Sequence, residues 1–219
     1  MSLVIATYGD LKDAVKNECM RQNHRGFAEA LPRMVAFAEN RIFNGAGRPF
    51  ETPPLRVREL ENTADPLIFT NGSATLPDDY LDARLLLWDG DIKSTPTYEE
   101  PSTFRLNRST VSVGYPTRYT IEGSAILLSP KVSGNLTFVY YARPAAFADD
   151  DDSNAVLLAY PDLYFQAVLI EAYGFIRAMD RKSDALAAYT SIINGIGSLD
   201  VRRKTGNMAL YPRVRRSWV

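Results

Sequence analysis

The sequence predicts an α+β protein in which helices from both chain ends form one bundle around an inserted antiparallel β domain. The stretch Tyr160–Met179 begins with Pro161 and Asp162, which suit a first helical turn, and it is apolar on most of its surface. Such a helix is buried on most sides, so other segments should pack around it. In the middle of the chain, apolar residues alternate with period 2, as in strands. Because neither terminal helix pair could bury its apolar face alone, we expect the two pairs to pack together.

The predicted organisation has three regions. Residues 1–48 and 153–199 form the helical bundle, residues 49–152 form the inserted β domain, and residues 200–219 form an extended C-terminal arm. The segment after Asp200 holds six Lys or Arg and no Asp or Glu, so residues 1–200 carry −7 of a chain whose net charge is −1. This asymmetry suggests an acidic body with a basic arm.

The composition excludes several classes of protein. A chain of 219 residues with 46% apolar and 23% charged residues can bury a core and is not disordered as a whole. The single cysteine, Cys19, excludes an internal disulfide framework and suits a reducing cytoplasm. The first residues do not resemble a signal peptide, and no apolar run approaches the roughly 20 residues of a spanning helix. We expect a cytoplasmically made protein that does not enter a membrane.

Two helices are expected before the β region. Thr7–Asp10 has the form of a capping box and predicts a helix that continues to about Arg21. Asn23–Gly26 interrupts the pattern, and a second helix is predicted from about Pro32 to Phe43. Asn44–Gly47 should end it, since Asn and Gly accept the left-handed conformation of a helix end.

The β region should contain a hairpin and a three-stranded meander. Thr70–Ser73 includes Asn-Gly, a pair that accepts positive φ twice and favours a hairpin turn. Leu81–Trp88 is predicted as a strand and Pro101–Asn107 as a short helix. In the strand Leu81–Trp88, alternation places four residues on one side: Leu81, Ala83, Leu85 and Leu87. The meander is expected over residues 118–122, 125–129 and 135–143, with its last strand covered on both faces.

After the β region, the helical pattern returns. Arg181–Asp184 is predicted as a short connection with Ser183 as the N-cap of a last helix, Ala185 to about Ile196. No periodicity remains from Leu199 onward, so the tail is expected to be extended or disordered when alone. The acidic run Asp149–Asp152 has two interpretations: an oxygen cage for calcium, or a solvated loop that caps the following helix.

The chain offers few candidates for catalysis or cofactor binding. An EF-hand beginning at Asp149 would require Gly and Glu where Asn154 and Tyr160 stand, so that motif fails. Cys19 and His24 could form a reactive pair, or His24 could simply be a partly exposed histidine at a helix end. Nucleotide-binding glycine motifs, nucleophile elbows and zinc-ligand spacing are absent from the sequence. We therefore predict no catalytic, metal or cofactor site.

The C-terminal arm combines basic residues with aromatic and apolar ones. Trp and Tyr are favoured as anchors of interfaces, and a merely solvating tail seldom carries them. The arm could dock into an acidic protein groove, contact nucleic acid through phosphates and stacked bases, or be inert. The predicted docking residues are Arg202, Arg203, Lys204, Leu210, Tyr211, Pro212, Arg213, Arg215, Arg216 and Trp218.

Several short motifs in the same order resemble bacteriophage head-to-tail adaptor proteins, over about residues 7–200. The most specific are Phe138–Pro144, followed by Leu158–Tyr164; the others are Leu76–Arg84, Trp88–Asp91, Arg118–Gly123 and Leu127–Pro130. Such adaptors, also described as tail accessory subunits, lie under the portal of short-tailed phages. The resemblance implies a ring of about twelve copies that attaches to the portal after genome packaging and receives tail nozzle or hub proteins. It places the protein in the virion neck, where double-stranded DNA passes through without specific binding.

The resemblance also implies a C-terminal extension that reaches the portal, and the basic, aromatic arm fits this role independently. Candidates for contacts between copies in the ring are Arg33, Arg41, Arg56 and Arg58. Two other functions stay open at this point: a cell-wall hydrolase that works through carboxylates, and a nucleic-acid-binding module with a basic arm.

Overall fold

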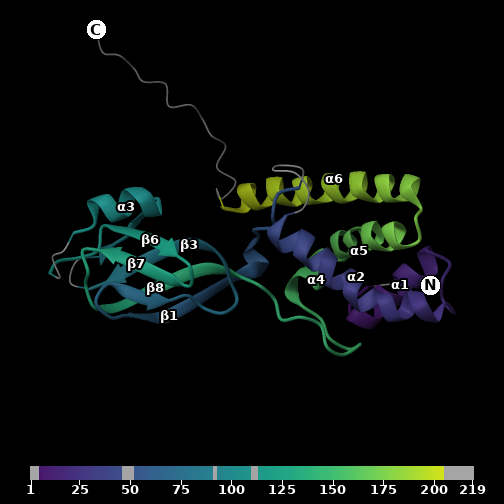
Figure 1. Ribbon diagram of the computed structural model, residues 1–219, viewed down its shortest axis with the longest axis horizontal. Helices are drawn as coiled ribbons and strands as arrows, with labels where there is room; N and C mark the ends of the chain where they lie inside the picture. The colour runs from purple at the N-terminus through teal and green to yellow at the C-terminus, as the bar shows by residue number, and fades with distance from the viewer. Residues whose placement is uncertain (1–4, 46–51, 91–92, 110–112, 205–219) are drawn as a thin grey trace, which may run out of the picture. The chain divides into compact units, whose positions relative to one another are not determined.

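The computed structural model describes residues 5–45, 52–90, 93–109 and 113–204, and it confirms the α+β class (Figure 1). The chain divides into two compact units. We call residues 1–12 with 59–161 the β unit, and residues 13–58 with 162–219 the helical unit. The predicted domain limits stay a prediction.

The helical unit is built from segments at both ends of the chain. Its helices are α2 (Arg25–Asn44), α5 (Pro161–Phe175), α6 (Met179–Lys204) and the second part of α1 (Tyr8–Glu18). The prediction that α5 is buried on most sides is confirmed, since eight of its fifteen residues are buried. The α2 side chain of Arg41 donates to the Glu171 carboxylate of α5 at 2.7 Å, which joins the early and late helices.

The second helix begins seven residues before its predicted start. His24 is its N-cap, and the imidazole Nδ1 accepts a hydrogen bond from the Phe27 N–H at 3.1 Å. The predicted start, Pro32, lies inside the helix. Burial of Phe27 and Leu31 on the same face as later core residues outweighs the backbone hydrogen bond that the proline lacks.

The last helix is longer than predicted at both ends. The chain reverses at Arg177, whose φ is 60°, so the predicted connection Arg181–Asp184 is wrong and these residues lie in α6. The helix then continues past Ile196 to Lys204, so the predicted extended structure is wrong for residues 200–204. Its buried face runs through Tyr189, Ile193, Ile196 and then Asp200; the polar residue at the fourth position concealed the continuation. The remainder of the predicted arm, 205–219, lies outside the described residues.

The β unit contains two four-stranded sheets that share one apolar core. The first has the order β1 (Glu61–Phe69), β8 (Gly134–Ala142), β3 (Tyr80–Asp89), β4 (Lys93–Ser94). The second has the order β2 (Ser73–Thr75), β7 (Ala125–Ser129), β6 (Arg118–Glu122), β5 (Thr97–Tyr98). Leu86 and Phe138 from the first sheet meet Ile126 and Leu128 from the second, as in a sandwich. The unit also holds the helices α3 (Pro101–Asn107) and α4 (Ala155–Ala159), and the single 3₁₀ turn η1 (Arg58–Leu60) lies at its boundary.

The predicted meander is wrong, although its strands are present. β6 and β7 form the expected antiparallel hairpin, but β8 leaves for the other sheet and pairs with β1 and β3. A strand with apolar residues on both faces is stable in the centre of a sheet, where both of its edges are paired.

The Asn-Gly turn is confirmed, but it joins strands that separate. Asn71 and Gly72 have φ values of 51° and 69°, and a single bridge links Thr70 to Ser73. β1 and β2 then enter different sheets. A Cβ on Gly72 would lie 2.7 Å from the Lys131 Cα, so only glycine fits where this turn contacts the connection between β7 and β8.

In β3 the prediction that Leu81, Ala83, Leu85 and Leu87 share one side is wrong, since Ala83 packs against the core and Leu85 does not. Leu85 is exposed and Leu86 is buried. The register against β8 shifts between Ala83 and Leu85, which places one extra residue in β3. Such a bulge reverses the alternation that follows it, and a simple period-2 pattern does not contain it.

The capping box is confirmed, and the acidic run turns out to support the same helix. The Asp10 N–H donates to Thr7 Oγ1 at 3.2 Å, and the Thr7 N–H donates to an Asp10 carboxylate oxygen at 3.0 Å. The backbone carbonyls of Asp150 and Asp152 accept hydrogen bonds from the first turn of α1. The prediction that the run caps the following helix is wrong, because Asn154 caps α4 by accepting from the Leu157 N–H at 2.8 Å.

Candidate docking surfaces

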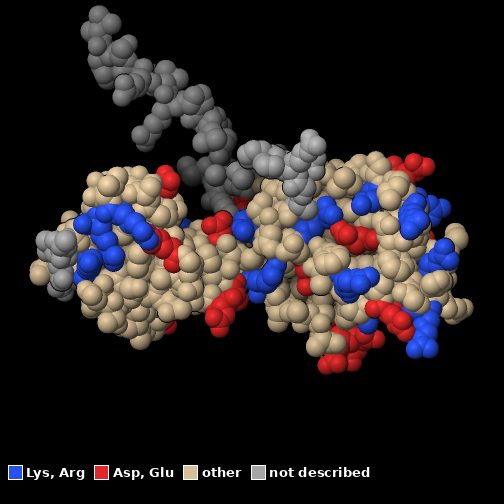
Figure 2. Space-filling model, in the orientation of Figure 1, with Lys and Arg blue, Asp and Glu red and all other residues tan. Residues whose placement is uncertain are grey.

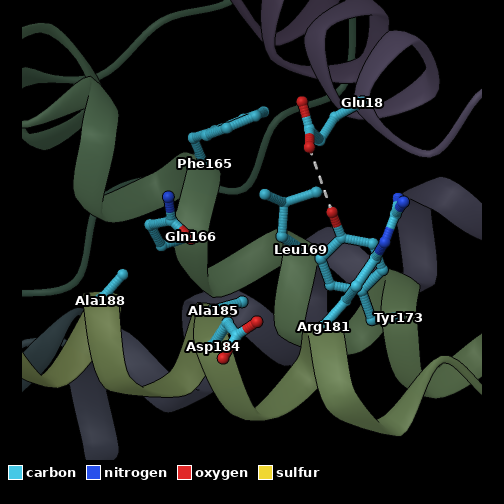
Figure 3. Close-up of a pocket in the computed structure, with 9 residues that line it drawn as sticks. All are labelled: Glu18, Phe165, Gln166, Leu169, Tyr173, Arg181, Asp184, Ala185 and Ala188. Atoms are coloured by element: carbon cyan, nitrogen blue, oxygen red, sulfur yellow. Dashed lines mark hydrogen bonds between the residues drawn. The ribbon is translucent and has the colours of Figure 1, made fainter.

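The helical unit has a groove between the end of α1 and the helices α5 and α6 (Figure 3). Its volume is about 460 Å³, and its lining residues are Glu18, Phe165, Gln166, Leu169, Tyr173, Arg181, Asp184, Ala185 and Ala188. The Tyr173 hydroxyl donates to a Glu18 carboxylate oxygen at 3.3 Å. Burial, and then the negative charge of Glu18, raise the pKa of Tyr173, so it remains a donor at neutral pH. The groove combines apolar residues such as Leu169 with charged residues such as Arg181 and Asp184, a combination that suits the binding of a peptide segment.

The β unit has a second cleft, which we call the tyrosine cleft. It is about 440 Å³ in volume and is lined by Tyr80, Asp82, Ala83, Tyr98, Tyr119 and Ile121. The rings of Tyr98 and Tyr119 meet edge to face, with centroids 5.6 Å apart. Burial first, and the nearby Asp82 carboxylate second, raise the pKa of Tyr80 to about 12. The cleft presents three aromatic rings beside a carboxylate, a combination that attracts cations and apolar side chains.

The outer face of α2 carries an exposed aromatic residue one helical turn from an exposed arginine. Phe37 is 55% exposed, and Arg33 lies four residues before it on the same face. Of the four arginines considered for contacts between copies, Arg33 and Arg58 are exposed. Arg41 and Arg56 instead make contacts within the chain: Arg41 pairs with Glu171, and Arg56 donates to the carbonyls of Phe43 and Leu55. Arg and aromatic side chains are the types that most often anchor interfaces.

The charges divide between the two units. The β unit holds eight Lys or Arg and sixteen Asp or Glu, a net charge of −8; the helical unit holds seventeen and ten, a net charge of +7. Six of the helical unit's positive charges belong to the segment after Asp200, and the continuous segment 59–161 carries the −8 of the β unit, so this division refines the acidic body and basic arm that the sequence suggested. Figure 2 shows basic residues near α3 on the β unit, where Arg105 and Arg118 form ion pairs with Glu122 and Glu99.

The predicted docking residues fall into two groups. Arg202, Arg203 and Lys204 lie in the last turn of α6. The others lie outside the described residues: Leu210, Tyr211, Pro212, Arg213, Arg215, Arg216 and Trp218. Because the structure describes only the first group, the predicted docking role stays a prediction.

The two side chains considered for reactivity, Cys19 and His24, both have a role in the fold. Cys19 is buried, and burial raises the pKa of its thiol to about 11. His24 uses Nδ1 to cap α2. In the described part of the chain, no group of three or more His, Cys, Asp or Glu is placed to hold a metal ion. Within the same residues, no helix combines the length and the apolar composition needed to cross a bilayer.

The two-unit α+β fold with its exposed clefts, aromatic residues and divided charge defines a protein suited to contacts with other proteins. The family model of the SU10 adaptor protein matches residues 6–216. The chain therefore belongs to the SU10 adaptor protein family, and its role is that of a structural bacteriophage adaptor. Comparison with curated proteins finds no match.

Proposed function

We propose that this protein is the head-to-tail adaptor of a virion neck, where about twelve copies form a ring on the portal. The ring extends the DNA channel and offers a platform for tail nozzle or hub proteins. The observation that carries this proposal is the family match, which runs through both units and into the arm, to residue 216. Because the match includes both units and most of the arm, we assign the whole chain to assembly rather than to catalysis.

The arm is the proposed portal anchor. It follows α6, a 26-residue helix whose last turn carries Arg202, Arg203 and Lys204. The seven further docking residues, from Leu210 to Trp218, combine positive charge with Trp and Tyr. A basic, aromatic segment gains most by entering an acidic groove in which its rings are removed from water. The proposed partner is therefore an acidic groove of the portal protein.

A deletion tests the portal anchor. Binding to purified portal rings should fall at least about tenfold when residues 205–219 are removed, since a lost anchor residue often costs 2 kcal/mol or more. The double substitution Tyr211→Ala and Trp218→Ala should reproduce most of this loss with the chain length unchanged. Leu106→Ala is the matched control, because Leu106 is an exposed apolar residue on α3 of the β unit. Equal portal affinity for the deleted and intact chains would contradict the proposal.

The proposed channel role requires that DNA slide past the protein without adhering. The β unit has a net charge of −8 and should repel duplex DNA, because affinity for DNA grows with the number of phosphates that cations neutralise. In a gel-shift assay at moderate salt, the full chain should leave a random duplex unshifted. A tight, salt-dependent shift that disappears when residues 205–219 are removed would favour the nucleic-acid-binding alternative.

A further inference from the structure

We propose that the tyrosine cleft of one copy receives the Arg33–Phe37 face of α2 from the next copy. This inference rests on the proposed function, because it identifies which surfaces meet between neighbours in the ring. It concerns contacts between copies, whereas the portal anchor concerns the arm, and the two can fail separately.

The cleft supplies the acidic and aromatic side of the contact. Tyr98 is 53% exposed and stands at the cleft wall, while Tyr119 is buried behind it. Asp82 lies beside the rings and is itself exposed. A guanidinium that stacks on an aromatic face and pairs with a carboxylate forms two favourable interactions at once. A cleft of about 440 Å³ also has room for one aromatic side chain besides the guanidinium.

The face of α2 supplies the complementary groups. Arg33 and Phe37 are both exposed and one turn apart, so they can enter one cleft together. Among the described residues of the helical unit, the other exposed phenylalanine is Phe175, which already packs against Phe27, with ring centroids 6.0 Å apart. Exposed apolar residues of the β unit such as Leu106 lie on a unit whose net charge has the same sign as that of the cleft. Phe37 is therefore the best matched occupant.

The charge of the two units favours a second copy as the partner. Without residues 205–219 the helical unit holds fourteen Lys or Arg and ten Asp or Glu, a net charge of +4. It therefore attracts the β unit of another copy, whose net charge is −8, and like units repel. A contact between two different surfaces of identical chains is heterologous, and repetition of such a contact closes into a ring when its rotation allows. The chain thus carries both halves of one repeating contact.

Sedimentation equilibrium of the full chain at low salt tests the proposal. Self-association should weaken at least about tenfold in Phe37→Ala and in Tyr98→Ala, because each removes an aromatic anchor. The charge reversals Arg33→Glu and Asp82→Arg should each weaken association, and the double variant Arg33→Glu with Asp82→Arg should restore much of it. Only a direct contact between these two positions predicts such a restoration.

Two controls change charge by the same amount at other exposed positions. Arg21→Glu in the helical unit and Asp65→Arg in the β unit should leave self-association within about threefold of the original, as expected for charges outside the contact. Circular dichroism verifies that each variant is folded. A chain that stays monomeric to about 1 mM, controls as harmful as the cleft variants, or a double variant without restoration would each overturn the proposal.

The same variants separate this inference from the proposed function. If deletion of 205–219 leaves portal binding intact while the cleft variants still lose self-association, the arm proposal falls and the contact between copies stands. If the deletion abolishes portal binding while the cleft variants associate normally, the contact falls and the arm proposal stands.

Discussion

The helical unit and the β unit differ in how much of their structure is encoded locally. In the helical unit, the buried residues of α2 and α5 can be recognised from their spacing along each helix. The two helices then pack through these buried residues. In the β unit, each strand is visible as a period-2 pattern, but its neighbours are chosen by the whole core. The comparison shows that a pattern identifies an element and a face, whereas strand partners depend on packing over long distances in the sequence.

If the two units are separate cores, damage to one should leave the other largely unaffected. Phe138 is fully buried in the β unit and stacks against Tyr140, so Phe138→Ala should cost about 3–5 kcal/mol of unfolding free energy. In a Trp218→Phe background, Trp88 fluorescence reports on the β unit, and circular dichroism at 222 nm follows the helices, most of which lie in the helical unit. Urea titration should show a large shift by fluorescence and a small shift by circular dichroism. Equal shifts would mean one cooperative body.

The close contact between Gly72 and Lys131, in two connections of the β unit, gives the next largest effect. Gly72→Ala combines a positive φ with a clash against the Lys131 backbone and should cost about 2–4 kcal/mol. Gly123 has a similar φ of 60°, but an added Cβ there meets nothing within 4 Å. Gly123→Ala should therefore cost only about 1–2 kcal/mol. Chemical denaturation followed by Trp88 fluorescence measures the unfolding free energy of both variants. Equal losses of stability would argue against the close contact between Gly72 and Lys131.

The ion pair between α2 and α5 is the corresponding test in the helical unit. The side chains of Arg41 and Glu171 are 19% and 20% exposed, so Arg41→Met leaves a largely buried carboxylate unpaired. We expect a loss of about 1–3 kcal/mol, below the value for a fully buried pair. Adding Glu171→Leu should recover most of the stability, as measured by thermal melting at 222 nm. A double variant no better than Arg41→Met would show that the two charges are not coupled.

Much of the fold could be predicted because helix faces and turn residues act locally. The capping box at Thr7–Asp10, the positive φ at Asn71–Gly72 and the helix Pro101–Asn107 all follow from a few neighbouring residues. The failures involve distant packing. The pairing of β8 and the burial of Phe27, which extends α2 past Pro32, are decided by segments elsewhere in the chain.

The candidate surfaces were harder to predict from the sequence than the elements. The basic arm was visible because six Lys or Arg follow Asp200 with no acid among them, whereas the boundaries that divide the charge between the two units come from the folded structure. The tyrosine cleft brings Tyr80, Tyr98 and Tyr119 together from three strands. The exposed Asp82 is two residues after Tyr80 on the same strand, but the rest of the cleft forms only when β3, β5 and β6 pack together.

Acid should reveal a smaller difference between the units. The described carboxyl groups with a lowered pKa are Asp10, Glu122 and Asp152, and all belong to the β unit. Backbone N–H donors lower the pKa of Asp10 and Asp152, and Arg105 lowers that of Glu122. A folded-state pKa below the unfolded one adds stability above about pH 4, and that stability is lost as the pH falls.

The β unit should therefore lose more stability than the helical unit between pH 7 and pH 3. Paired urea titrations with the fluorescence and circular dichroism probes measure this difference. Asp152→Asn should reduce the pH dependence of the fluorescence transition only. A larger acid-induced shift at 222 nm than in fluorescence would contradict the assignment of these groups.

The central claim is that the protein assembles on a portal through its C-terminal arm. The most direct test is the mass of portal rings with and without the purified chain, measured by native mass spectrometry. The account predicts added mass equal to about twelve chains for the intact protein and none for the protein without residues 205–219. No added mass with the intact chain, or the full added mass with the deleted one, would contradict it.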